Sequence, residues 1–254
     1  MIFATLVSKP LLLALIVISS AFFTSALSGL VGMAGGMLLM FILISIMPVA
    51  SAMIFHAITQ ISANGSRAWL LREHLVWRLL PPYLIGAGMA ATLGAMIAFV
   101  PEPGMVLVLI GLFPWLARCS QSIAGLNIMH PPTAMLCGFI VTSAQLTAGA
   151  SGPVLDMFYL QSGLGREAVV ANKSLTQTIG HGLRILYYGV LIDISYELSP
   201  WLLGATVLAA LLGTRLGTWL LRRWNDAQFQ RITSKIILTI ATISLLQGLR
   251  LLFI

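Results

Sequence analysis

Apolar residues fill ten long stretches of the chain, and the short links between them carry most of the charged residues. A membrane-spanning helix needs roughly 20 apolar residues; several stretches reach that length, whereas others are much shorter. The pattern predicts an all-α polytopic membrane protein. The stretches cover residues 11–28, 37–47, 49–66, 79–100, 105–116, 133–148, 154–160, 169–192, 201–221 and 236–254.

The chain also repeats itself at a shift of 117 positions, which aligns residues 22–67 with residues 139–184. Twelve positions in this alignment are identical, and they include two glycine pairs, Gly32/Gly149 and Gly35/Gly152. Transporters built from two repeats place their substrate site between the repeats, near the middle of the bilayer. We therefore expect a single transmembrane transporter domain over residues 1–254, with repeats at about 9–125 and 130–254.

Composition agrees with a membrane location, because 59% of the residues are hydrophobic and only 8% are charged. A soluble domain has about 25% charged residues. The net charge of +7 is spread over the links instead of forming one basic face, so no nucleic-acid partner is predicted. The lipid bilayer is the expected environment, and a bacterial inner membrane is the expected location.

Two segments, residues 11–47 and 133–163, are too long for one crossing of a ~30 Å core and are interrupted by glycines. If each segment enters the membrane and returns to the same face, the links that carry Arg67, Arg118 and Arg166 all lie on one side, as the positive-inside tendency requires. Each repeat then contains one re-entrant, broken helix hairpin and three transmembrane helices. Three crossings are an odd number, so the two repeats are predicted to be inverted, with the N-terminus outside.

The breaks in these hairpins are candidate anion sites. Irregular backbone at membrane depth must be buried in protein or line a cavity. A helix that begins at such a break offers free N–H groups and the positive end of its dipole, and glycine lets a ligand approach closely. The alternative is that the glycines only permit tight helix packing. The candidate substrate-binding residues here are Gly32, Gly35, Gly36, Gly149, Ser151 and Gly152.

A second set of matched residues forms a polar stripe on two predicted helices. Residues spaced i, i+4 share a helix face, and uncharged donors suit an anion that must also be released. The alternative role is hydrogen bonding between helices. The candidates are Gln60, Asn64, Thr176, Gln177 and His181.

Four charged residues complete the candidates. Lys173 is either a counter-charge for the anion or a surface residue. Asp156 is an acid inside a predicted membrane segment, which makes it a candidate for proton coupling with Lys173 or Arg184 as partner. Arg67 and Arg184 are interpreted as helix-end residues that reach the membrane interface, unless they serve the site.

No hydrolytic, redox or nucleotide-binding motif occurs in the chain, so neither an enzyme nor a cofactor is predicted. The segments SGLVGMAGG with HAITQISANGSRAW, and TAGASGP with NKSLTQTIGHGLRILYYG, resemble the two signature regions of the sulfite exporter family of the TauE/SafE type. This resemblance implies a permease for small anions such as sulfite, sulfonates or organic acids, with proton or sodium coupling. The second break, GASGP, departs from the double glycine of the first.

These observations favour a secondary transporter that works by alternating access and holds its anion at the midplane, between the two breaks. Two alternatives remain open from the sequence. An anion channel would use the same donors without a carrier cycle, and a non-transporting membrane scaffold would use the polar stripes for packing alone.

Overall fold

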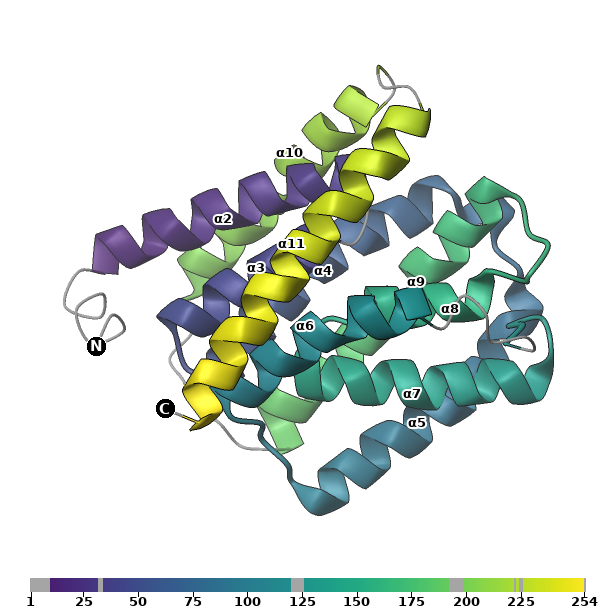
Figure 1. Cartoon of the computed structure of the whole chain (residues 1–254), viewed down its shortest axis with the longest axis horizontal. Coiled ribbons are helices and arrows are strands. Elements are labelled where there is room, and N and C mark those ends of the chain that lie inside the picture. The colour runs from purple at the N-terminus through teal and green to yellow at the C-terminus, as the bar shows by residue number, and fades with distance from the viewer. Residues whose placement is uncertain are drawn as a thin grey trace.

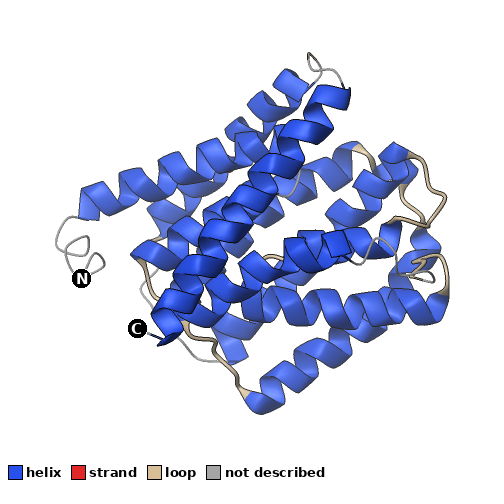
Figure 2. Cartoon of the chain, viewed as in Figure 1, coloured by secondary structure: helices blue, strands red, loops and turns tan. Residues whose placement is uncertain are grey.

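The computed structural model describes residues 10–31, 34–119, 126–191, 199–221, 223 and 226–253. Within these ranges the chain folds into ten α-helices (Figures 1 and 2). Each apolar stretch predicted from the sequence coincides with one helix, which confirms the all-α class. The helices are α2 (Pro10–Val31), α3 (Ala34–Ile46), α4 (Val49–Leu70), α5 (Leu80–Ile97), α6 (Pro103–Cys119), α7 (Pro131–Ala148), α8 (Gly152–Tyr159), α9 (Arg166–Leu186), α10 (Pro200–Leu221) and α11 (Asp226–Phe253).

The second glycine-interrupted segment is broken where the sequence predicts, between α7 and α8; in the first segment α2 ends at Val31 and α3 begins at Ala34, and residues 32 and 33 lie outside the described part. Gly149 follows α7 in the left-handed conformation, with φ of 71°, which glycine adopts without strain. The two helices on either side of the first predicted break differ in length, because α2 has 22 residues and α3 has 13. At ~1.5 Å per residue α2 is long enough to cross a ~30 Å membrane core by itself. A helix that enters the membrane and returns to the same face could be shorter.

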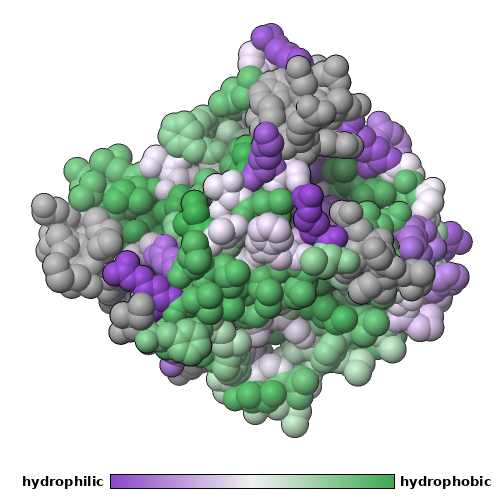
Figure 3. All heavy atoms as spheres, in the orientation of Figure 1, coloured by the Kyte–Doolittle hydropathy of each residue, from purple (hydrophilic) through white to green (hydrophobic). Residues whose placement is uncertain are grey.

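Four helices in the described part of the chain are long and apolar enough to cross a membrane, and they lie in α2, α5, α10 and α11. Helices α4 and α9 have similar lengths but carry the polar stripe, and they pack against each other in the interior. The outer helices expose large apolar side chains such as Met96, Leu246 and Phe253. Apolar residues cover much of the face seen in Figure 3. The chain is a multi-pass membrane protein.

Helices of each half of the chain pack against helices of the other half. Helix α2 of the first half packs along α10 of the second, and α7 of the second half packs along α5 of the first (Figure 1). Glycines make both crossings close: a Cβ at Gly217 would lie 2.0 Å from the carbonyl oxygen of Ala26, and one at Gly138 would lie 2.0 Å from that of Tyr83. Helices α4 and α9, and likewise α6 and α11, pair across the halves.

Candidate functional site

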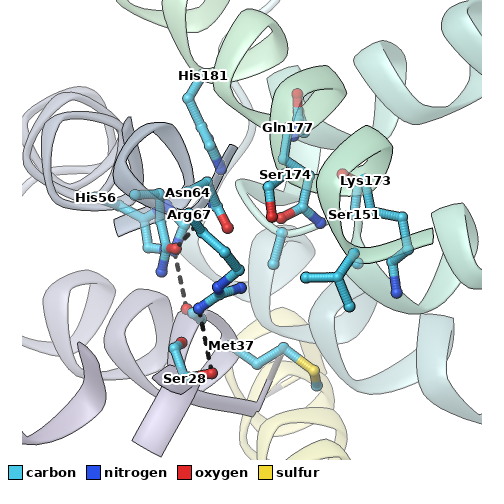
Figure 4. Close-up of a pocket in the computed structure, with 16 residues that line it drawn as sticks. Ser28, Met37, His56, Asn64, Arg67, Ser151, Lys173, Ser174, Gln177 and His181 are labelled. Carbon is cyan, nitrogen blue, oxygen red and sulfur yellow. Dashed lines mark hydrogen bonds between the residues drawn. The ribbon is translucent and has the colours of Figure 1, made fainter. Parts of the chain in front are cut away.

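A cavity of about 110 Å³ lies where the two breaks meet helices α4 and α9. It is several times larger than the roughly 10–15 Å³ that one water molecule needs, so it has room for a small polyatomic anion. The start of α3 contributes Gly36 and Met37, and the second break contributes Ala150, Ser151 and Gly152. The two breaks therefore face one shared space, which Figure 4 shows in close-up.

Most of the residues predicted from the sequence meet in this cavity. The lining includes residues from both breaks and both polar stripes, namely Gly36, Gln60, Asn64, Ser151, Gly152, Lys173, Gln177 and His181. Asp156 lies behind this wall on α8, where its carboxylate accepts a hydrogen bond from the Lys173 ammonium. Lys173 was one of its two expected partners.

Three predicted residues are placed elsewhere. Gly35 lies against α2, where a Cβ would meet the carbonyl oxygen of Thr24 at 1.9 Å, so it serves close helix packing. Gly149 packs against Met40 and Arg184 behind the cavity. The Thr176 hydroxyl donates to the carbonyl of Asn172, one turn back in its own helix, at 2.9 Å. Gly32 lies outside the described residues.

The cavity wall repeats at the same shift of 117 positions that the sequence shows. Four pairs of matched residues line it, with one member of each pair from each half. The pairs are Ser28/Gln145, His56/Lys173, Gln60/Gln177 and Asn64/His181. Only Gln60/Gln177 is identical in residue type, so identity in the alignment does not single out the other three pairs.

The matched arginines also make matched contacts. Arg67 donates from Nη2 to the carbonyl oxygen of Ser28 at 3.4 Å, and Arg184 donates from Nη1 to that of Gln145 at 3.3 Å. Both carbonyls belong to the last turn of a helix, and the Gln145 carbonyl also accepts the backbone N–H of Gly149 at 3.1 Å. Arg184 also donates to the carbonyl of Gly149 and is completely buried. The interpretation of Arg184 as a residue that reaches the membrane interface is therefore wrong.

A hydrogen-bonded chain connects the two halves through His56. The Arg184 Nη2 lies 2.6 Å from His56 Nδ1, and His56 Nε2 lies 2.8 Å from the carbonyl oxygen of Gly36. Arginine can only donate, so Nδ1 of His56 must accept. The imidazole proton is then on Nε2 and is donated to Gly36. This chain ties α9 to the start of α3.

Several buried polar groups at the cavity have no protein partner in the described part of the chain. They are both amide atoms of Gln145, the Ser151 hydroxyl and Nδ1 of His181. A buried polar group left unpaired costs about 1–3 kcal/mol. These groups line a cavity with space for a ligand, so a bound molecule that pairs with them recovers this cost.

The charges around the cavity favour an anion. Arg67 and Lys173 line it, Arg184 lies directly behind it, and none of the described lining residues is acidic. Helix α8 begins here at Gly152, and the Ser151 side chain makes no capping bond to its free N–H groups. A helix N-terminus adds partial positive charge.

Several lining residues are not among those predicted from the sequence, namely Ser28, Met37, His56, Gln145 and Ser174. Two of them carry a usable signal in the repeat. His56 stands at the position matched to Lys173, and Gln145 stands four residues before the break at Gly149, matched to Ser28. Ser174 follows Lys173 directly, whereas Met37 is indistinguishable from a packing residue.

A family model described as Sulfite exporter TauE/SafE matches residues 17–245. The matched span contains every residue that lines the cavity. No curated protein and no solved structure matches the chain.

Proposed function

The chain belongs to the sulfite exporter TauE/SafE family, and we propose that it carries a small sulfur oxyanion through this cavity as a secondary transporter. The family consists of membrane transporters of sulfur anions and not of enzymes. The observation that carries the proposal is the cavity itself. The start of α3 and the second break meet there, and several buried polar groups around it have no protein partner among the described residues.

The proposed architecture is a pair of inverted repeats. Two features support it. Helices α2 and α7, which match at the shift of 117, each pack against a helix of the other half. Arg67 and Arg184, which match at the same shift, each donate to a carbonyl in the turn before a break. An exchange of roles between such halves is the usual basis of alternating access.

The proposed cycle opens the cavity at one end at a time. From His56 and His181 the cavity extends toward the C-terminal end of α4 and the N-terminal end of α9, where Arg67 and Val170 line it. At the other end, Arg184 ties the second break to His56. Rocking of one half against the other would break these contacts and close the opposite end.

The pair of Asp156 and Lys173 is the proposed coupling element. An anion in the cavity competes with the Asp156 carboxylate for the Lys173 ammonium. Once displaced, the carboxylate is an unpaired acid at membrane depth, where a charge without a partner is costly and proton uptake removes it. This arrangement favours proton coupling over sodium coupling.

Transport by purified protein in liposomes tests the function. We expect uptake of labelled sulfite that speeds up when unlabelled sulfite is present on the other side. A channel would show flux without this trans-stimulation, and a scaffold would show no flux.

A double variant tests the site. Gln60→Ala with Gln177→Ala should abolish uptake without unfolding the protein, because both amides line the cavity. Gln161→Ala, a change at an exposed glutamine, is the control and should transport normally. Normal sulfite uptake by the folded double variant would contradict the assignment of the anion site to this cavity.

A further inference from the structure

The two matched arginines are used differently in this conformation. Arg184 is completely buried and contacts Gln145, Gly149 and His56. Arg67 is partly exposed, lines the cavity, and has one hydrogen bond within the described residues, at 3.4 Å to Ser28. We propose that Arg67 is the cationic ligand of the transported oxyanion, whereas Arg184 keeps the cavity closed at its other end, beside His56 and the second break. This inference rests on the transport function proposed above.

Lys173 is a weaker candidate for the same role, although it also lines the cavity. Its ammonium already bonds the Asp156 carboxylate, so the pair contributes little net charge to the empty cavity. A salt bridge must be broken before Lys173 can bind an anion. The Arg67 guanidinium bonds only a neutral carbonyl among the described residues, and at the long end of the hydrogen-bond range.

The shape of the guanidinium indicates the class of anion. It presents five N–H donors in a planar fork, which matches two oxygens of one anion at once. Sulfite, sulfonates and carboxylates offer such oxygen pairs, whereas a halide offers a single acceptor. The ligand of Arg67 is therefore expected to be an oxyanion.

The neighbours of Arg67 supply further donors around the same space. Asn64, one turn earlier on α4, donates to Gln60 Oε1 at 3.3 Å, which leaves the Gln60 Nε2 group facing Gly36. A Cβ at Gly36 would lie 2.8 Å from that nitrogen, so glycine leaves room for the amide. Figure 4 shows Arg67 between Asn64 and Ser28, and Ser151 lies across the cavity. An oxyanion held by Arg67 therefore has donors on both sides.

Equilibrium binding of sulfite to the purified full-length protein in detergent tests the proposal. Arg67→Gln should weaken sulfite affinity roughly 10- to 100-fold, the loss expected for a charge-assisted hydrogen bond. Arg67→Lys keeps the charge without the fork and should lose an intermediate amount. Arg72→Gln is the matched control, because Arg72 is exposed and stacks on Trp69 outside the cavity.

Arg184→Lys should behave differently from both Arg67 variants. It removes bonds that hold two backbone carbonyls and His56, so it should lower the midpoint of thermal unfolding. Methanesulfonate should compete with sulfite for the wild-type protein more strongly than chloride does. Equal competition by chloride would overturn the proposal that the Arg67 guanidinium binds two oxygens of one anion.

The outcomes separate this inference from the transport function. If the wild type binds and transports sulfite while Arg67→Gln binds it equally well, Arg67 is not the ligand and the transporter proposal stands. If the wild type neither binds nor moves sulfite, the transport function itself fails. Should Arg67→Gln not fold, Arg67→Lys decides: a loss of affinity supports the proposal, and unchanged affinity overturns it.

Discussion

Gly180 lies on α9 against the side chain of Gln145, whose amide is buried at the cavity without a partner among the described residues. A Cβ at Gly180 would lie 1.6 Å from Oε1 of Gln145, far inside contact distance. The amide is the end of a flexible side chain, so Gly180→Ala should turn it away instead of unfolding the helix. Gly182 lies on the same helix with no atom within 4 Å of an added Cβ, which makes Gly182→Ala the matched control.

The expected magnitudes follow from these contacts. In a helix, alanine is favoured over glycine by about 1 kcal/mol. Strain in the displaced Gln145 side chain, about 0.5–1.5 kcal/mol, should offset most of that gain in Gly180→Ala. Loss of the Gln145 hydrogen bond to an anion costs about 1.5–3 kcal/mol, or roughly 10- to 100-fold in affinity.

The assay is uptake of labelled sulfite by proteoliposomes over a range of sulfite concentrations, together with thermal unfolding in detergent. We expect a raised KM for Gly180→Ala and a wild-type KM for Gly182→Ala, with both proteins folded. Equal KM values for the two folded variants would refute the assignment of Gln145 to the anion site.

Three further predictions follow from the ion pair and the helix packing. Lys173→Gln leaves Asp156 as an unpaired acid beside the cavity and should reduce sulfite uptake by roughly tenfold. Asp156→Asn should instead tighten sulfite binding and stop uptake driven by a proton gradient; gradient-driven uptake that persists would rule out Asp156 as the coupling group. Gly217→Ala should cost about 1–3 kcal/mol of stability, because its Cβ would lie 2.0 Å from the carbonyl oxygen of Ala26. Gly204→Ala, on the same helix with no atom within 4 Å, should not lower the unfolding midpoint, and equal midpoints for the two variants would contradict the close crossing.

The polar stripe could be predicted because it depends on helix geometry alone. Gln60 and Asn64 are four residues apart, so they share a face of α4 whatever the helix packs against. The breaks could be predicted because glycines interrupt segments that are otherwise long apolar runs. Eight of the residues selected on these local features line one cavity.

The role of Arg184 could not be read in the same way. An arginine near a helix end is compatible with a position at the membrane interface. It is buried because Gly149 and Gln145, 35 and 39 residues away, present carbonyls to it, and only tertiary packing creates that arrangement. Thr176 belongs to the predicted polar stripe, but its hydroxyl bonds the carbonyl of Asn172 in its own helix, as threonine often does.

The most direct test of the central claim is a crystal structure of the protein with bound selenite, an oxyanion close to sulfite in shape, using ordinary methionine in the protein. The anomalous signal of selenium locates the anion without reference to any variant. We expect a peak between the two breaks, within hydrogen-bond distance of Gln145, Ser151 or Gln60. A selenium peak found only outside this cavity, in a protein that still transports, would show that the anion does not bind there.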